Sequence, residues 1–431
     1  MPSVGHTSTG EDLDVATFVV RDVMEGPETR WDHGRLLIDL SAVEVLSAGS
    51  SPGVLRVQAE IVRPGQPVRL VNVLDAVDPV VKKNAPQTTF PGALGELAVA
   101  GAGVSNRLDG VAVVSLADFR ATHDVNALAC SPDGEGVIDM AGPGAYLSPW
   151  SATVNLALTF ECDPDASLAD ADRSIRAITL RAARDLAAAT VEAMPVAVES
   201  FALHPADDSL PAVCVILQVA AEGPLSDTFF YGRSVEGILP TLIDPREVLD
   251  GALTSGQYDW AGSRNPTAFY QRSVLLRELL DRHGRDLRFA GVILALGYLP
   301  SAREKERSAL LAARLAKRIG AEAAVLTTFQ TGNSHTDTVL TAQACARLGV
   351  ATVVLFAETD AGLTDWAPET DCVVSTGNEE ELVPEWRPAR VLGGEMTYSG
   401  RSAMVAGRLP VAEYLGAVSQ MGDMRLRAVT W

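Results

Sequence analysis

Helix-like and strand-like segments alternate regularly between residues 269 and 358, and this alternation restricts the fold more than any other feature of the chain. Strand-like runs with almost no polar residue, such as FAGVILAL (289–296) and ATVVLFAE (351–358), each follow a segment with helical periodicity. Continuous apolar strands separated by helices are typical of a parallel sheet that helices cover on both faces. We therefore expect a Rossmann-like doubly wound sheet, with ligands beyond the carboxyl ends of its strands.

The amino-terminal part of the chain, up to residue 160, has a different character, because short alternating runs are separated by glycine and proline turns. Runs such as VLRVQAEIV (54–62) predict strands of a meander or small barrel rather than of a parallel sheet. The sequence thus predicts an α+β part followed by an α/β part. We expect a β-rich domain over residues 1–160, a Rossmann-like domain over residues 161–395 and a carboxyl-terminal extension over residues 396–431.

Composition excludes several classes of function. With 431 residues, of which 47% are hydrophobic and 21% charged, the chain has the composition of a soluble globular enzyme. Its formal net charge of −20 disfavours nucleic acid or an anionic membrane surface as a partner. The amino-terminal residues are polar, and no apolar run approaches the roughly 18–20 residues of a membrane span, so we expect a cytoplasmic protein. The five cysteines form no CxxC pair and no histidine spacing indicates a metal site.

A small-residue segment, GNSHTDT (332–338), lies between a strand-like run and a helix-like segment. In a doubly wound sheet this position offers backbone N–H groups to an anion at a helix amino terminus. Ser334 and Asp337 also have the spacing of a capping box, which needs no ligand, and Gly332 and Asn333 suit a tight turn. Capping and substrate binding both stay open at this point.

His335, in the middle of GNSHTDT, is the candidate for acid–base chemistry in this segment. The usual pKa of a histidine, about 6.5, suits proton transfer near neutral pH. A loop above the sheet would expose this side chain to a substrate.

Several longer blocks follow one another in a recognisable order. They are IVRPGQPVRLVNVLDAVDPVVK, TTFPGALG, GVIDMAGPGA, DGALTSGQYDWAGSRNPT and GNSHTDT. In content and order they resemble the component B alpha/beta proprotein of glycine, sarcosine and betaine reductases, over about residues 55–394. Within GVIDMAGPGA, Asp139 and the stiff Gly-Pro-Gly turn predict either a capped turn between domains or the wall of an interface or active site.

The block DGALTSGQYDWAGSRNPT (250–267), here called the processing segment, resembles the self-cleavage site of that family. There the chain breaks itself in front of a cysteine that becomes a pyruvoyl group, and Tyr258 stands at the position of this cysteine. A tyrosine hydroxyl cannot close the five-membered ring through which the preceding carbonyl is attacked. The resemblance therefore implies a member that stays uncleaved and lacks the pyruvoyl cofactor. Ser255 carries a hydroxyl on its β carbon and is an alternative precursor, three residues earlier.

Tyr258, Asp259 and Trp260 together allow two interpretations. Two aromatic rings beside a carboxylate could form a cage for a cationic amine through cation–π contacts. They could equally fill a cavity that has lost its function, because aromatic side chains occupy space well.

The resemblance implies a heteromeric complex, in which a separate partner subunit carries a cysteine or selenocysteine. The complex would cleave a carbon–nitrogen bond of a small amine substrate reductively, and this chain would bind and orient that substrate. A scaffold without catalytic residues is the alternative. A nicotinamide-dependent enzyme is disfavoured, because GAGVSN (101–106) lacks the third glycine and the following helix of a dinucleotide site. The candidate catalytic residues are His335, Asp337 and Tyr258, and the candidate substrate contacts are Gly332, Asn333, Ser334, Asp259, Trp260 and Ser255.

Overall fold

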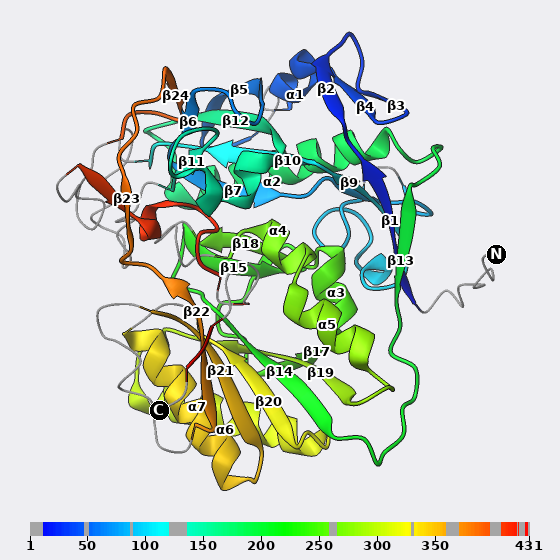
Figure 1. Cartoon of the computed structure of the whole chain (residues 1–431), viewed down its shortest axis with the longest axis vertical. Helices are drawn as coiled ribbons and strands as arrows, with labels where there is room; N and C mark the ends of the chain where they lie inside the picture. The colour runs from blue at the N-terminus through cyan, green and yellow to red at the C-terminus, as the bar shows by residue number, and fades with distance from the viewer. Residues whose placement is uncertain are drawn as a thin grey trace.

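The computed structural model describes residues 12–46, 51–86, 89–119, 136–257, 265–328, 332–358, 370–396, 407–419, 421 and 427–429. It consists of mixed sheets with helices and is mostly strand, at 26% helix and 38% strand. Two sheet-rich halves lie one above the other in Figure 1, with a small sheet between them. Within the described residues, no helix is both long enough and apolar enough to cross a lipid bilayer.

Two four-stranded sheets form much of the upper half of Figure 1. In order across each sheet, the first contains β13 (Ala197–Phe201), β1 (Leu13–Val19), β9 (Gly103–Asp109) and β8 (Val80–Lys82), and the second contains β5 (Val54–Val62), β12 (Val154–Cys162), β10 (Val111–Leu116) and β7 (Val73–Val77). β1 runs parallel to β9 and β10 runs parallel to β12, whereas the other pairs in these sheets are antiparallel. Each sheet is therefore mixed, neither a purely parallel sheet nor a meander of consecutive strands.

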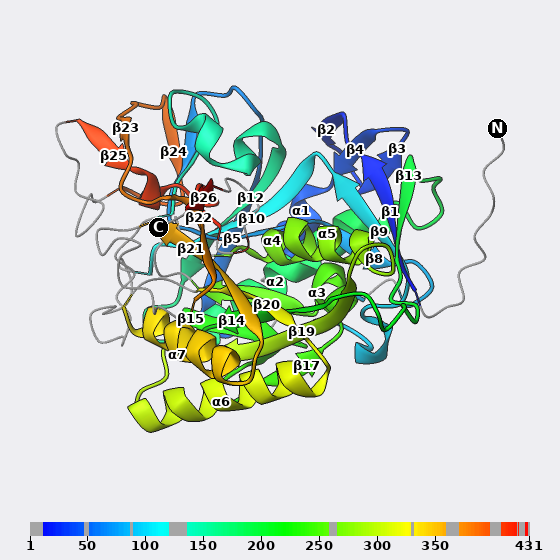
Figure 2. The same cartoon turned by 60° about the horizontal axis from the view of Figure 1, so that its bottom comes forward.

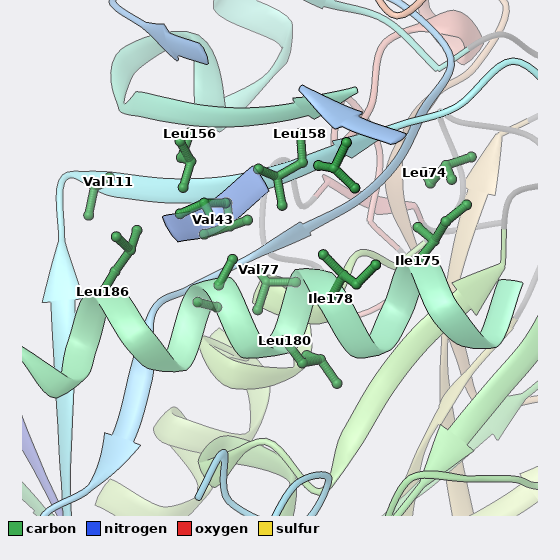
Figure 3. Close-up of a cluster of buried hydrophobic side chains, with 14 of the residues drawn as sticks. Val43, Leu74, Val77, Val111, Leu156, Leu158, Ile175, Ile178, Leu180 and Leu186 are labelled. Carbon is green, nitrogen blue, oxygen red and sulfur yellow. The ribbon is translucent and has the colours of Figure 1, made fainter. Parts of the chain in front are cut away.

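Helix α2 (Leu168–Ala188) packs against strands of both sheets. The helix begins where the side chain of Ser167 accepts the N–H of Asp170, which is a typical amino-terminal cap. Apolar side chains of α2 point toward the strands in Figure 3 and form one buried cluster with them. Members of this cluster are Val77, Val111, Leu156, Leu158, Ile175, Ile178 and Leu186.

Short elements complete the upper half. A three-stranded sheet precedes α1 (Leu40–Val45) and contains β2 (Asp22–Glu25), β4 (Arg35–Ile38) and β3 (Arg30–Asp32). In this sheet β4 runs parallel to β2 and antiparallel to β3. A further sheet contains β11 (Ile138–Asp139), β6 (Val68–Leu70) and β24 (Arg390–Leu392), and β23 (Leu382–Pro384) pairs with β25 (Arg408–Pro410). β13 and β24 thus pair with strands that precede residue 160, and the predicted division at residues 160 and 395 stays a prediction.

A seven-stranded sheet forms the lower half of Figure 1. In order across the sheet, its strands are β17 (Thr241–Ile243), β19 (Arg288–Leu296), β14 (Ala212–Val219), β20 (Ala323–Thr327), β21 (Ala351–Glu358), β22 (Cys372–Asn378) and β26 (Arg427–Val429). The five inner strands are parallel, whereas β17 and β26 are antiparallel to their neighbours. The inner strands follow the chain order 2-1-3-4-5 rather than the 3-2-1-4-5-6 order of the Rossmann fold. A Rossmann-like arrangement is therefore not confirmed.

Helices pack on both faces of this sheet. α6 (Ala302–Arg318) and α7 (Asn333–Arg347) lie side by side on one face, as Figure 2 shows. Cys214 and Ile216 of β14 belong to the buried cluster beneath these two helices, and the alternate residues Val215 and Leu217 belong to the cluster beneath α5 (Val274–Arg282). Successive side chains of β14 point to opposite faces of the sheet, and helices cover both faces. Both sets of side chains are therefore buried, which explains why β14 is apolar from Val213 to Leu217.

The segment with helical periodicity before β19 consists of two shorter helices. α4 (Thr267–Gln271) ends just before α5 begins, and the side chain of Ser273 accepts the N–H of Leu276 at 3.3 Å. A serine that caps a new helix interrupts the earlier one, because its backbone leaves the helical conformation. The preceding helix, α3 (Pro245–Asp250), leads into β18 (Leu253–Gln257), which pairs with β15 (Ser226–Phe230), and β15 pairs in turn with β16 (Arg233–Ser234). In Figure 1 this three-stranded sheet lies between the two halves.

A buried cluster of charges joins the carboxyl-terminal residues to the upper half. Arg69 donates two hydrogen bonds to Asp139, at 2.6 and 3.0 Å, and a third to Glu385 at 3.0 Å. The hydroxyl of Tyr414 donates to the same carboxylate of Asp139 at 3.2 Å. Burial raises the pKa of Asp139, although the Arg69 guanidinium opposes that shift. Asp139 is therefore an ion-pair partner of Arg69 rather than a helix or turn cap.

The Gly-Pro-Gly turn after Asp139 lies directly against aromatic side chains from the carboxyl-terminal part of the chain. A β carbon on Gly142 would meet the ring of Trp386 at 2.6 Å, and one on Gly144 would meet the ring of Tyr414 at 2.4 Å. Contacts this short leave no room for a side chain, so glycine at both positions permits the packing of Trp386 and Tyr414.

Replacing Asp139 with asparagine should lower the free energy of unfolding by about 3–5 kcal/mol, because the buried Arg69 guanidinium would lose its bidentate partner. Urea unfolding followed by circular dichroism measures this change. The matched control is Arg390→Gln, which removes a surface ion pair with Glu60 and should cost less than about 1 kcal/mol. An equal effect of both substitutions would contradict the role assigned to the buried cluster.

Candidate functional site

The start of the processing segment is fixed by a buried ion pair with β8. Lys82 Nζ lies 2.5 Å from the Asp250 carboxylate, and both side chains are almost fully buried. Asp250 also accepts hydrogen bonds from the hydroxyl of Ser105 and, at 2.8 Å, from the N–H of Gly101. Lys82 donates to Ser105 at 3.0 Å as well. The ion pair is thus surrounded by further hydrogen bonds, which a buried pair needs to offset its desolvation.

The block TTFPGALG packs against the residues that follow Asp250. A β carbon on Gly92 would lie 2.5 Å from the Cα of Ala252, and one on Gly251 would lie 2.9 Å from the ring of Phe90. Gly92 and Gly251 both have positive φ angles, of 76° and 112°, which also favours glycine. Two blocks that are far apart in the chain therefore meet through close contacts at their glycines.

The end of the processing segment is held by Asp75 of β7. The Asp75 carboxylate accepts the N–H of Thr267 at 2.8 Å and its hydroxyl at 2.6 Å. The Thr267 hydroxyl in turn accepts the N–H of Ser255 at 2.9 Å. One buried carboxylate and one threonine thereby connect residues on both sides of 258–264. Tyr258, Asp259 and Trp260 lie outside the described residues, so the cage and the filled cavity both stay predictions.

The helix that follows the processing segment is fixed to the same β7–β8 region. The Gln271 side chain bonds both backbone groups of Asp78, at 3.0 and 3.2 Å, and Arg272 forms an ion pair with the Asp78 carboxylate. Tyr270 is fully buried, and this burial raises the pKa of its hydroxyl. The upper half therefore anchors α4 and the described ends of the processing segment.

The segment GNSHTDT forms the first turns of α7 rather than a loop. The helix begins at Asn333 after Gly332, which has a φ of 69° and no side-chain cap. The predicted capping box is absent here, because Ser334 lies inside the helix and its carbonyl accepts the Gln218 side chain at 2.9 Å. Gly332 does occupy the turn position expected of it.

Asp337 forms a buried ion pair with Lys305 of α6. Lys305 Nζ lies 2.8 Å from the Asp337 carboxylate and 3.0 Å from the carbonyl oxygen of Asn333. Burial raises the pKa of Asp337, although Lys305 opposes the shift. The other carboxylate oxygen of Asp337 makes no hydrogen bond within the described part of the chain. A catalytic role for Asp337 stays a prediction, and the ion pair gives this residue a structural role in any case.

His335 is buried rather than exposed above the sheet. Its side chain is 9% exposed, and its ring lies 5.4 Å from the ring of Phe356 at the end of β21. The expected exposure was wrong because the segment is helical and turns this side chain toward the sheet. Acid–base chemistry by His335 stays a prediction.

Both candidate segments lie near the carboxyl end of β14. Gln218 of β14 contacts Ser334 of α7, and the N–H of Ala220 donates to the hydroxyl of Thr228 at 3.3 Å. Thr228 of β15 pairs with Ser255 of β18. A short path through β14 and β15 therefore connects GNSHTDT to the processing segment, at the edge of the sheet where the alternation predicted ligands.

Sequence reasoning missed Lys82, Asp75 and Lys305, which hold these segments in place. Lys82 and Asp75 occur in the block IVRPGQPVRLVNVLDAVDPVVK and Lys305 lies in α6, but a single charged residue in a sequence usually indicates a solvated surface. Within the ranges that the structure describes, no three His, Cys, Asp or Glu side chains gather as metal ligands. That the chain holds no metal ion and no pyruvoyl cofactor stays a prediction.

Comparison with known proteins gives one consistent result. A family model described as glycine/sarcosine/betaine reductase component B subunits matches residues 12–413. The chain is 30% identical over 393 residues to the glycine reductase complex component B subunits alpha and beta of Acetoanaerobium sticklandii, with 88% of each chain covered. No solved structure matches.

Two relatives from Peptoclostridium acidaminophilum extend this result. The chain is 28% identical over 378 residues to a sarcosine reductase complex component B subunit alpha, with 85% of each chain covered. It is 28% identical over 414 residues to a betaine reductase complex component B subunit alpha, with 92% of this chain and 90% of the relative covered.

Replacing Lys82 with methionine should lower the free energy of unfolding by about 3–5 kcal/mol, because it leaves the Asp250 carboxylate buried without a counter-charge. The control Lys83→Met changes an exposed neighbour and should stay close to wild type. Urea unfolding measures both. The double variant Lys82→Met, Asp250→Asn should recover part of the loss, and strictly additive losses would contradict a coupled pair.

Proposed function

Because this chain belongs to the family of glycine/sarcosine/betaine reductase component B subunits, we propose that it is the substrate-orienting subunit of a reductase complex. The substrate is a small amine or amino-acid-derived molecule. A partner subunit with a cysteine or selenocysteine carries out reductive cleavage of its carbon–nitrogen bond, or of a similar carbon–heteroatom bond. The relatives that support this assignment are named components of reductase complexes.

The observation that carries the proposal is the framework that fixes both ends of the processing segment. Its first residue, Asp250, is paired with Lys82, and its last residue, Thr267, is bonded to Asp75. Between these fixed ends Tyr258 stands where the family has a cysteine. A segment held at both ends but without its nucleophile fits a chain that positions a substrate and forms no covalent bond with it.

The geometry of Ser255 argues against the alternative precursor. Ser255 lies within β18, where it pairs with Thr228 of β15. Its backbone N–H donates a hydrogen bond to the Thr267 hydroxyl. An acyl shift would require the carbonyl of Thr254 to leave this regular strand and meet the Ser255 hydroxyl. We infer that the chain stays in one piece and that no pyruvoyl group forms.

Orientation alone can contribute much of the rate in such a complex. Holding the reacting carbon next to a thiolate or selenolate converts an encounter into an intramolecular step. A quaternary or N-substituted amine would not need a pyruvoyl carbonyl, because it cannot form a stable imine. Asp259 beside Tyr258 and Trp260 would then attract the cationic nitrogen. The cytoplasmic location expected from the sequence is part of the same proposal.

The rival function is a scaffold whose own site has decayed. In the reconstituted complex, His335→Gln and Asp259→Asn should each lower turnover by roughly tenfold or more, since each 1.36 kcal/mol of lost transition-state binding is a factor of ten. Complex formation, measured by analytical ultracentrifugation, should not change. Wild-type turnover in both variants would favour the scaffold, and loss of complex formation would assign these residues to the interface.

A further inference from the structure

Strand β13 forms an open edge of the molecule. It is the outermost strand of its four-stranded sheet, and among the described strands only β1 pairs with it. Figures 1 and 2 both show it at the outer margin of the molecule. An edge of this kind presents backbone N–H and C=O groups to which a further strand can bond.

The free edge of β13 carries the backbone groups of Ala197 and Glu199. The N–H of Val196 donates to the carbonyl of Thr17 in β1 at 2.9 Å, so the backbone groups of Val196 point inward. Backbone groups of successive residues in a strand point to opposite edges. Those of Ala197 and Glu199 therefore point outward, away from β1.

The side chains at the start of β13 are apolar and exposed. Met194 is 88% exposed, Val196 67% and Val198 54%. Proteins commonly protect an edge strand with a charged side chain such as lysine, but residues 194–198 carry no charge. The first charge that follows, Glu199, is already paired with Arg277 at 2.6 Å. This segment is therefore suited to association with another strand.

The strand is complementary to itself in the antiparallel direction. A two-fold axis at Ala197 places Val196 opposite Val198 of the second copy, on one face of the sheet. The outward backbone groups of Ala197 then meet those of Ala197 in the second copy, and the N–H of Glu199 meets the carbonyl of Pro195. No like charges face each other in this register. Proline has no N–H, so the shared ladder ends at Pro195.

We propose that β13 pairs antiparallel with β13 of a second copy of this chain. The two four-stranded sheets then become one continuous sheet across a two-fold axis. Two short strands on their own bury less than the roughly 1,200 Å² of a stable interface, so we expect a weak dimer that depends on concentration. No residue of the processing segment takes part, and the dimer is independent of the proposed function.

The net charge of −20 on each copy determines how salt affects this dimer. Two chains of like charge repel each other, and salt screens the repulsion. The pairing uses backbone hydrogen bonds and apolar contacts, without an ion pair between the copies. Dimerisation should therefore strengthen as the ionic strength rises, whereas an interface built on ion pairs would weaken.

Sedimentation velocity of the full chain over a range of concentrations tests the proposal. The mass should rise from 45.5 kDa toward twice this value. Val196→Lys should raise the dissociation constant roughly tenfold, because each dimer loses two contacts between valines. The control Val45→Lys makes the same change at a valine of α1 that is 65% exposed, and it should dimerise like wild type. Both positions are exposed, so circular dichroism should show unchanged folding.

A pair of opposite charges tests the register. Val196→Lys combined with Val198→Glu places opposite charges against each other across the two-fold axis, so dimerisation should return toward the wild-type level. Salt screens these new ion pairs, and the double variant should therefore gain less from added salt than wild type does. Val196→Lys combined with Val198→Lys places like charges there and should dimerise less than either single variant.

Hydrogen exchange measured by mass spectrometry locates the interface. The peptide that contains residues 194–201 should exchange more slowly at high protein concentration, because the outward N–H groups of Ala197 and Glu199 become bonded. The peptide that contains Val45 should exchange at the same rate at every concentration.

Four outcomes would overturn the proposed dimer. The chain could stay monomeric at every concentration. A dimer that Val196→Lys leaves unchanged, or in which residues 194–201 exchange as fast as in the monomer, would form through another surface. A double variant with opposite charges that stays as weak as Val196→Lys alone would exclude pairing about Ala197. Slower exchange of residues 194–201 only when a reductase partner subunit is present would assign the edge to that subunit.

Discussion

The buried ion pair of Lys82 and Asp250 is the interaction on which the position of the processing segment most depends. One charge lies on the last residue of a short strand in the upper half, and the other lies at the end of the helix that leads into the processing segment. Two charges removed from water cost several kcal/mol each unless they are paired and hydrogen-bonded. This requirement fixes the relative position of β8 and β18 more strictly than apolar packing could, because apolar surfaces tolerate sliding and hydrogen bonds do not.

The same logic applies to the other contacts around the site. Asp75 holds Thr267, Asp78 holds Arg272, and Lys305 holds Asp337. Each pair joins a residue of one element to a residue of another, and in each pair the carboxylate is buried. Together they form a rigid surround for the described residues on either side of 258–264 and for the start of α7. A rigid surround is what a site needs if its contribution is to orient a substrate beside another subunit's nucleophile.

Local structure could be predicted from the sequence, whereas long-range pairing could not. The strand expected over 351–358 matches β21 residue for residue. The order of the strands could not be derived, because β1 pairs with β9, which lies far along the chain, and nothing in either run specifies the partner. His335 shows a second limit. Its segment reads as a loop, but packing against Phe356 and the Lys305–Asp337 pair extends the helix to Asn333.

The central proposal is that this chain holds, within a rigid surround, a segment that resembles a self-processing site, and that it does not process itself. The most direct measurement is the denatured intact mass of the purified protein, with and without a hydrazine reagent for carbonyl groups, beside a Tyr258→Cys variant as the positive control. We expect one unmodified chain near 45.5 kDa for the wild type, and two fragments, one of them labelled, for the variant. Two wild-type fragments that meet between Thr254 and Tyr258, with one taking up the reagent, would contradict the account and make Ser255 a pyruvoyl precursor.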